Sequence, residues 1–230
     1  MNGPKLIFEL PFGINITETV FLSWCIIIVV ALLLLYLTHD MEKIPTKKRQ
    51  VIAEWIVEVV NNLVKENMGE KFMGFAPYIA ALFTYSIFGS LIGLIGLRPV
   101  TADINTTATW AVTTALMVQI VKIRTSGFGG YLKGFAEPVA AITPLNIISE
   151  FSTPVSMAFR HFGNIAAGMV ISSLIYMGLG SLSALLHLPI PLLQVGLPAV
   201  LSLYFDIFSG FMQAYIFCML TMVFVSSAAE

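Results

Sequence analysis

SEFSTPVSMAFRHFGN, residues 149–164, places one arginine, Arg160, inside a long apolar run. Between Phe151 and Phe205 the chain has no other Asp, Glu, Lys or Arg. At bilayer depth an arginine costs at least ~2.5 kcal/mol, and it does not escape that cost by losing its proton. A charge kept there indicates a function that needs a fixed cation inside a membrane. The alternative is that Arg160 reaches a lipid headgroup, or pairs with a carboxylate only to hold helices together.

The composition of the whole chain predicts an all-α membrane protein that crosses the bilayer several times. Hydrophobic residues make up 57% of the 230 residues, charged residues 11%, and the mean hydropathy is +0.88. Soluble domains carry roughly 25% charged residues. The net charge of −1 argues against nucleic acid as a partner. Cys25 and Cys218 lie in apolar runs, so we expect two small buried side chains, with no disulfide, metal site or cofactor.

The N-terminal third predicts an exposed arm, a first span and a cytoplasmic loop. Prolines and glycines within residues 1–17 disfavour regular structure there. Residues 18–38 are apolar and long enough to cross the bilayer, so we expect a retained helix and not a cleaved signal peptide. The densest basic cluster follows at residues 39–49. By the positive-inside rule this loop is cytoplasmic, and the N-terminus lies outside.

Residues 46–68 predict an amphipathic helix, because apolar side chains recur at helical spacing among charged ones. The helix carries too much charge to cross the bilayer, so we expect it to lie along the cytoplasmic interface. Docking on another subunit is an alternative that is compatible with this placement. The apolar stripe comprises Val51, Ile52, Trp55, Ile56, Val59, Val60, Leu63 and Val64.

Two further spans are predicted over residues 75–97 and 107–122. The first contains glycines in a small-xxx-small pattern, which allows another helix to approach closely. Residues 98–107 predict a polar outer turn, in which Asn105 or Thr106 is expected to cap the next helix. The basic residues after the second of these spans return the chain to the cytoplasmic side.

The C-terminal part predicts two long helices, over residues 143–180 and 191–228. Each exceeds the ~20 residues that cross a bilayer perpendicularly, so we expect a strongly tilted hairpin. The chain is then a single polytopic domain, residues 1–230, with five transmembrane helices and one interfacial helix. Its C-terminus is cytoplasmic.

Polar side chains form a stripe on each long helix. Ser156, Arg160 and Asn164 share one face of the first helix at i, i+4 spacing. Such groups need partners in hydrocarbon, so the stripes face each other, an aqueous channel or another protein. A salt bridge between Arg160 and Asp206 is one interpretation; the other turns Arg160 toward a carboxylate on a moving partner, while Asp206 lines a separate aqueous path. The second stripe comprises Ser202, Asp206, Ser209, Gly210 and Gln213.

These residues carry a family likeness. PVSMAFRHFGNIAAG, residues 154–168, resembles the arginine-bearing segment of subunit a of F-type ATP synthases, whose core reads Arg-Leu-Phe-Gly-Asn. Residues 206–230 are similar to that subunit's last helix, TADINTT at 101–107 to its outer loop, and KENMG at 65–69 to the end of its interfacial helix. The likeness follows the chain in order from about residue 45 onward.

The resemblance implies a non-catalytic, ion-conducting stator subunit of a rotary ATP synthase. Because no organelle-targeting sequence is apparent, we expect the bacterial inner (plasma) membrane, with a chloroplast or mitochondrially encoded protein as the alternative. Two offset aqueous half-channels would lead H⁺ or Na⁺ to and from the rotor ring of c subunits, and Arg160 would separate them. Asp206 falls in the outer half-channel, and Glu150 is the acid expected in the inner one. The other ion-translocation residues are Asn164, Gln213, Ser202 and Ser209. The implied partners are the c-ring, the b subunits of the peripheral stalk, the remaining ATP synthase subunits and membrane lipids.

The sequence departs from the family pattern at two positions. His161 replaces the usual leucine, and we expect it to be a hydrogen-bonded structural group and not a proton relay. Met169 stands where many members carry a glutamate, so Asp206 is left to carry the outer relay alone. Two other functions remain open. One is a secondary transporter with an Arg160 and Asp206 site, although the chain lacks the internal repeat that many transporters show. The other is a structural subunit held by a buried salt bridge.

Overall fold

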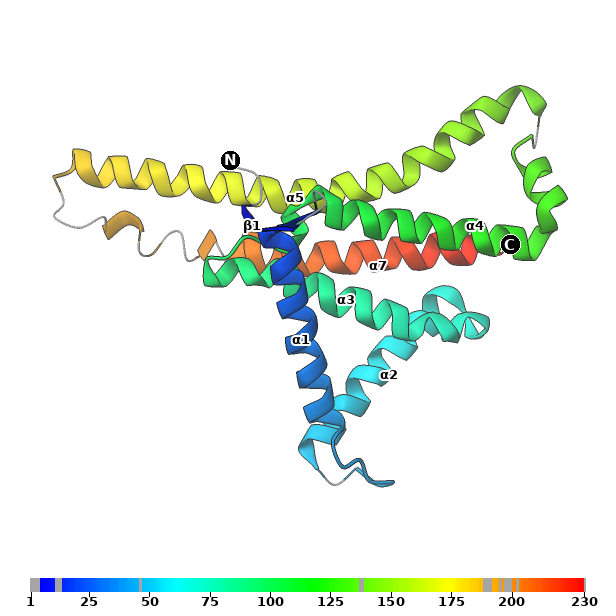
Figure 1. Ribbon diagram of the computed structural model, residues 1–230, viewed down its shortest axis with the longest axis horizontal. Helices are drawn as coiled ribbons and strands as arrows, with labels where there is room; N and C mark the ends of the chain where they lie inside the picture. Colours follow the sequence, from blue (N-terminus) through cyan, green and yellow to red (C-terminus); the bar gives the residue numbers. More distant parts are fainter. Residues whose placement is uncertain are drawn as a thin grey trace.

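The computed structural model shows a mostly helical chain (Figure 1). The described residues are 5–10, 14–45, 47–136, 139–187, 192–194, 196, 200–201 and 203–229. The main helices are α1 (Glu18–Thr38), α2 (Lys48–Met68), α3 (Ala76–Leu91), α4 (Ile104–Gly134), α5 (Thr143–Leu185) and α7 (Ser209–Ser227). Short 3-10 segments at Glu70–Phe75, Ile92–Ile95, Val100–Ala102, Ala140–Ile142 and Leu192–Gln194 and a π-helical turn at Leu203–Phe208 lie between them.

Within the described residues, four helical segments are long and apolar enough to cross a membrane. These are Glu18–Thr38, Glu70–Ile95, Thr143–Leu185 and Leu203–Ser227. The helix that covers the predicted span 107–122, α4, is not one of them, because threonines and Gln119 dilute its apolar residues. The structure therefore supports a mainly helical membrane protein, and it does not establish a count of five spans.

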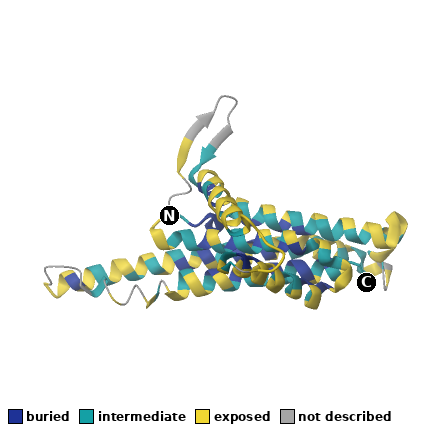
Figure 2. Cartoon of the chain, turned by 90° about the horizontal axis from the view of Figure 1, so that it is seen from below, coloured by how far each residue is buried: buried dark blue, intermediate teal, exposed yellow. Residues whose placement is uncertain are grey.

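The expectation of an irregular N-terminal arm was wrong for part of that arm. Strands β1 (Leu6–Leu10) and β2 (Ile14–Thr17) pair in antiparallel fashion just before α1. Their isoleucine, phenylalanine and threonine residues favour extended backbone, which outweighs the nearby Pro and Gly. The hairpin projects away from the helices (Figure 2).

One group of helices lies side by side, and α1 stands across it. In Figure 1, α3, α4, α5 and α7 lie roughly along one common axis, while α1 crosses them steeply. The buried residues of α1, which are Thr19, Leu22 and Ile26, lie in its first half. Neighbouring helices α5 and α7 contact each other and run in opposite directions (Figure 1).

Two of the long helices change direction. Along α5 the ribbon bends (Figure 1), and Pro154 inside this helix removes one backbone donor and favours such a bend. Within α4, Gly127 has non-helical angles, φ 69° and ψ 165°, and the helix turns there. The second predicted long helix is not one continuous α-helix, because the π-helical turn Leu203–Phe208 precedes α7. Its predicted start at residue 191 lies outside the described residues.

The cap of α4 corrects another expectation. Neither Asn105 nor Thr106 caps this helix; Asp103 does, and its Oδ1 accepts a hydrogen bond from the Asn105 backbone N–H at 3.0 Å. The second oxygen of Asp103 accepts from the Thr19 hydroxyl of α1 at 2.8 Å. A carboxylate can satisfy a helix end and a neighbouring helix at once, which a single hydroxyl does less well.

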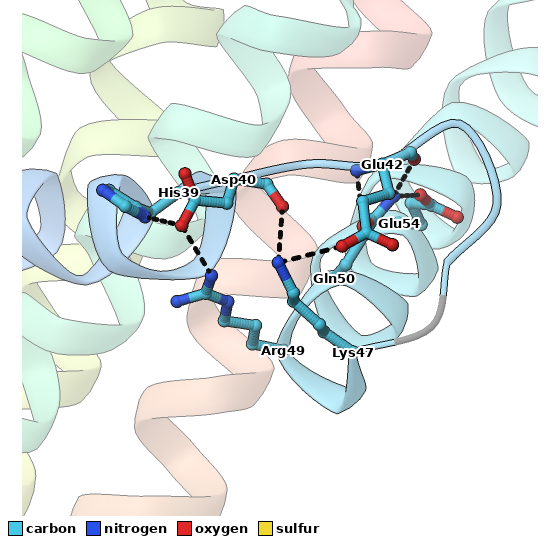
Figure 3. A network of polar contacts seen from close by, with 7 residues as sticks. All are labelled: His39, Asp40, Glu42, Lys47, Arg49, Gln50 and Glu54. Atoms are coloured by element: carbon cyan, nitrogen blue, oxygen red, sulfur yellow. Dashed lines mark hydrogen bonds and ion pairs between the residues drawn. The ribbon is translucent and has the colours of Figure 1, made fainter.

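The loop between α1 and α2 is held by its own polar contacts (Figure 3). Lys47 pairs with Glu42 at 3.0 Å, and Arg49 Nη2 lies 3.5 Å from Asp40 Oδ2. Gln50 is buried and donates to Glu54 Oε1 at 2.7 Å. Asp40 and Glu42 therefore neutralise part of the positive charge of residues 39–49, the basic cluster from which a cytoplasmic location was predicted.

The apolar stripe of α2 is covered by the chain only toward its C-terminal end. Of its members, Val64 is buried, Val60 and Leu63 are half-buried, and the others are exposed. The covered end packs into the main core, whose buried members include Ile79, Ala111, Met157, Phe217 and Met222. Cys218 is buried in the same core and Cys25 is half-buried; both are free thiols.

Candidate functional site

Arg160 lies on the outward face of α5. Its side chain is exposed, and among the described residues it forms no hydrogen bond and no ion pair. In particular, no ion pair joins Arg160 to Asp206, so the simple salt bridge considered from the sequence is not formed. Arg160 lines a hollow of about 410 Å³ between α5 and α7. The polar members of its lining are Ser149, Ser152, Thr153 and Ser156.

The outward direction of Arg160 follows from what the opposite face of α5 buries. Met157, Ala158, His161, Ile165 and Gly168 are buried, and their spacing of one, three and four residues marks a single helix face. The predicted polar stripe falls on the other side. Its members Ser156, Arg160 and Asn164 are all exposed.

His161 is the buried neighbour that ties α5 to three other helices. Its side chain is 1% exposed, and its Nε2 lies 3.4 Å from the Ser86 hydroxyl of α3. Trp110 of α4 and Phe217 of α7 each approach the imidazole edge-on, with ring centroids 5.6 Å away. The other nitrogen, Nδ1, has no partner among the described residues. This environment is that of a structural group, as expected from the sequence.

Glu150 sits near the start of α5 and is held by α4. Lys122 Nζ lies 2.8 Å from each carboxylate oxygen of Glu150, and the side-chain amide of Gln119 also donates to Oε1. The three residues line a cavity of about 270 Å³. A second cavity of about 440 Å³ shares Lys122 and Glu150 with the first. The pair therefore stands where two cavities meet.

The cavity beside Glu150 adjoins the hollow beside Arg160. Both are lined by Ser149, Thr153, Met157 and Phe224. A partly polar surface thus leads from the Lys122–Glu150 pair toward Arg160. Arg160 lies ten positions after Glu150, which corresponds to about 15 Å along a helix.

Asp206, the acid expected in the outer half-channel, belongs to a turn that packs beside α5 beyond Arg160, on the side away from Glu150. Asp206 is half-buried in the π-helical turn Leu203–Phe208, and π-helical turns are frequent at functional sites. This turn contacts α5 at Gly168, where an added Cβ would lie 3.6 Å from Phe205 Cβ. Gly168 is eight residues past Arg160, about 12 Å along a helix. Arg160 therefore lies between Glu150 and the segment that carries Asp206.

The second polar stripe is only partly observed. Gln213 is buried on α7, and Ser209 is half-buried at its first residue. Ser202 lies outside the described residues. Asp206 lies in the π-helical turn, where the hydrogen-bond spacing is i, i+5, and α7 begins directly after that turn at Ser209. Glycine at position 210 lets α7 approach Ser90 of α3, since a Cβ there would meet Ser90 Cβ at 3.0 Å.

Sequence reasoning missed Lys122 and Gln119 as site residues. Lys122 is one of the basic residues at the end of the predicted span 107–122, which the sequence analysis used only to orient the chain in the membrane, and Gln119 did not enter. Their spacing of three residues places both on one face of α4, but the sequence carries no signal that this face meets Glu150. The packing of α4 on α5 alone brings them together.

Comparison with known proteins finds matches along nearly the whole chain. A family profile described as "ATP synthase A chain" matches residues 20–226. "ATP synthase subunit a, sodium ion specific" of Propionigenium modestum is 29% identical over 262 residues, which cover 99% of this chain and 86% of the relative. ATP synthase subunit a of Sulfurihydrogenibium sp. is 34% identical over 216 residues, 92% and 96% of the two chains. The same subunit of Limosilactobacillus reuteri is 32% identical over 237 residues, 98% of each.

Proposed function

Because the chain belongs to the ATP synthase A chain family, we propose that it is the ion-conducting stator subunit of an F-type ATP synthase. The family resemblance found in residues 154–168 is thereby confirmed. Family membership also argues against the secondary transporter that the sequence alone left open. The subunit itself is non-catalytic in this proposal, and it supplies the path through which H⁺ or Na⁺ drives rotation of a c-ring.

The observation that carries the proposal is the position of Arg160. It is exposed on the outward face of α5, without a partner among the described residues, between two separate polar regions. The cavities at Glu150 correspond to the inner half-channel, and the turn with Asp206 to the outer one. Asn164, Gln213 and Ser209 contribute along the faces described above, and Ser202 is kept as a candidate from the sequence.

A fixed cation between two half-channels has two electrostatic effects. It repels a cation that would pass directly from one half-channel to the other. It also stabilises the ionised form of an approaching ring carboxylate, which promotes release of the bound ion. Transfer of one charge across the potential releases ~2.3 kcal/mol per 100 mV, and this energy turns the ring only if ions cannot bypass it.

The placement in the membrane follows the sequence reasoning. We place α4 as a fifth crossing, although its composition is more polar than that of the four apolar segments, and α5 with α7 as a tilted hairpin. The antiparallel contact of α5 with α7, and the steep crossing of α1 over them, support this arrangement (Figure 1). The N-terminus is then outside and the C-terminus cytoplasmic, in a bacterial inner membrane.

The partners follow from the same proposal. The c-ring faces Arg160, the b subunits of the peripheral stalk contact the stator, and the remaining ATP synthase subunits complete the complex. One relative bears the name "sodium ion specific", so Na⁺ is tested beside H⁺ as the coupling ion.

The deciding experiment is ion-driven ATP synthesis by the assembled complex in vesicles, with passive ion leak as a second readout. Arg160→Ala should abolish coupled synthesis and increase leak. Arg124→Ala removes an exposed cation of α4 that forms no ion pair with a described residue, and it should leave both readouts near wild type. Tight vesicles with unchanged synthesis by Arg160→Ala would rule out the proposal.

A further inference from the structure

The proposed function gives Lys122 no role, although this residue forms an ion pair with Glu150, the acid that lines both inner cavities. We propose that Lys122 is a tethered cation that competes with the transported ion for Glu150, and thereby sets how readily ions cross the inner half-channel. This inference rests on the proposed function and deepens it.

The contact geometry is that of a competitor for both carboxylate oxygens. Lys122 Nζ stands at 2.8 Å from Oε1 and at 2.8 Å from Oε2, so it occupies the position that a bound cation would take. Gln119, one turn earlier on α4, donates to the same carboxylate and helps to hold it in place. The chain does not fully enclose the pair, since the side chains of Lys122 and Glu150 are 34% and 20% exposed.

The location of the pair links it to ion passage. Both residues line the cavity of about 270 Å³ and the cavity of about 440 Å³. An ion that moves between these cavities therefore passes Glu150. Conduction requires a site that attracts the ion but releases it again. A carboxylate alone in such a place would retain a cation, whereas an ammonium on a flexible four-carbon chain can take its place and promote release.

The other groups that face Glu150 do not substitute for Lys122. Among the described residues that line the two cavities, Lys122 and Glu150 are the charged ones, and Tyr131 is a further titratable group. A tyrosine phenol ordinarily titrates at about 10. Tyr131 therefore stays neutral at physiological pH. The end of α7 contributes Ser227 and Ala228, which do not titrate.

Removal of the Lys122 ammonium is expected to raise the affinity for the coupling ion and to lower the maximal rate of ATP synthesis. Without the ammonium, Glu150 holds the incoming ion longer. Half-maximal synthesis should then need about two- to fivefold less coupling ion, the range for one partly exposed ion pair, while the maximal rate falls. A purely structural role for Lys122 would lower the amount of assembled complex without moving the half-saturation concentration.

The test uses Lys122→Gln, Lys122→Arg and the matched control Arg124→Gln in the assembled complex. ATP synthesis in vesicles is measured against pH and, separately, against Na⁺ concentration, and it is normalised to the amount of complex. Lys122→Gln should lower both the half-saturation concentration and the maximal rate, whereas Lys122→Arg and Arg124→Gln should follow wild type. A Lys122→Gln curve that coincides with that of Arg124→Gln overturns the inference.

Failure of this inference is distinguishable from failure of the proposed function. If Arg160→Ala abolishes synthesis while Lys122→Gln behaves as wild type, the stator assignment stands and the competing-cation role is wrong. If Arg160→Ala leaves synthesis intact, the function itself is wrong.

Discussion

At the scale of single residues, Arg160 and His161 show how one step along a helix separates two roles. A step of about 100° turns Arg160 outward and His161 inward. The imidazole contacts Ser86, Trp110 and Phe217, which belong to three different helices. These contacts fix the rotation of α5, and the rotation of α5 decides where the guanidinium points.

His161 offers a direct test of this packing role. His161→Ala removes a ring that is 1% exposed and should destabilise the subunit by about 2–4 kcal/mol, as large-to-small core substitutions do. His161→Leu should cost much less, because leucine fills most of the volume and removes a buried nitrogen that has no partner among the described residues. The thermal midpoint of the purified complex measures both. Equal damage by the two variants would show that the imidazole acts through more than its volume.

At the scale of elements, the breaks in the helices matter as much as the helices. The bend of α5, the turn of α4 at Gly127 and the π-helical turn before α7 all interrupt regular i, i+4 spacing. Each interruption lies near a candidate site residue or near a cavity lining. Gly127 precedes Gly130 and Tyr131, which line the larger cavity at Glu150.

The break at Gly127 can be tested with a neighbouring glycine as the control. Gly127 has φ 69° and ψ 165°, a combination essentially restricted to glycine, which an alanine adopts only with strain of about 1–3 kcal/mol. No atom within 4 Å would obstruct a Cβ at this position. Gly127→Ala should therefore destabilise the end of α4 through the backbone alone. Gly129 lies in helical backbone with the same open surroundings, so Gly129→Ala should be neutral or stabilising. Hydrogen exchange of the amides of residues 122–136 reports the difference, and similar exchange in both variants would contradict it.

At the scale of the whole molecule, much apolar surface of the chain has no cover within the chain. Beyond its first half α1 is exposed, with side chains such as Leu32 and Leu35 at 61% and 66%. The stripe of α2 is exposed over Ile52, Trp55 and Val59. Surface of this extent is costly in water, so a bilayer and neighbouring subunits must cover it.

The placement of α2 at the interface predicts different environments for two adjacent positions. Val59 belongs to the apolar stripe, and Glu58 lies about 100° around the helix on the charged side; both are exposed in the chain. Spin labels on Val59→Cys and Glu58→Cys, in complex reconstituted in vesicles, should differ in their contact with a water-soluble relaxing agent. The label at 59 should be shielded, and the label at 58 should be accessible. Equal accessibility would place α2 in water.

Much of the architecture is readable from the sequence because the bilayer restricts what a chain can do. Apolar length predicts the helices that α1, α3 and α5 form, and the mixed stripe of residues 46–68 predicts α2. The unusual cost of a guanidinium at bilayer depth singles out Arg160 before any fold is known. These signals depend on local sequence or on composition, so they can be read without knowing which residues come into contact in the folded chain.

What depends on neighbours could not be read from the sequence. The strands β1 and β2, the cap by Asp103 and the π-helical turn with Asp206 each reflect local competition that composition does not resolve. The pairing of Lys122 with Glu150 joins residues 28 positions apart. By itself, the sequence determined that this chain is a membrane protein, and it predicted a fixed charge within an apolar run, because transfer energies are additive along the chain. Only the tertiary structure decided which face of α5 presents Arg160 and which cation meets Glu150, because both depend on how α4, α5 and α7 pack.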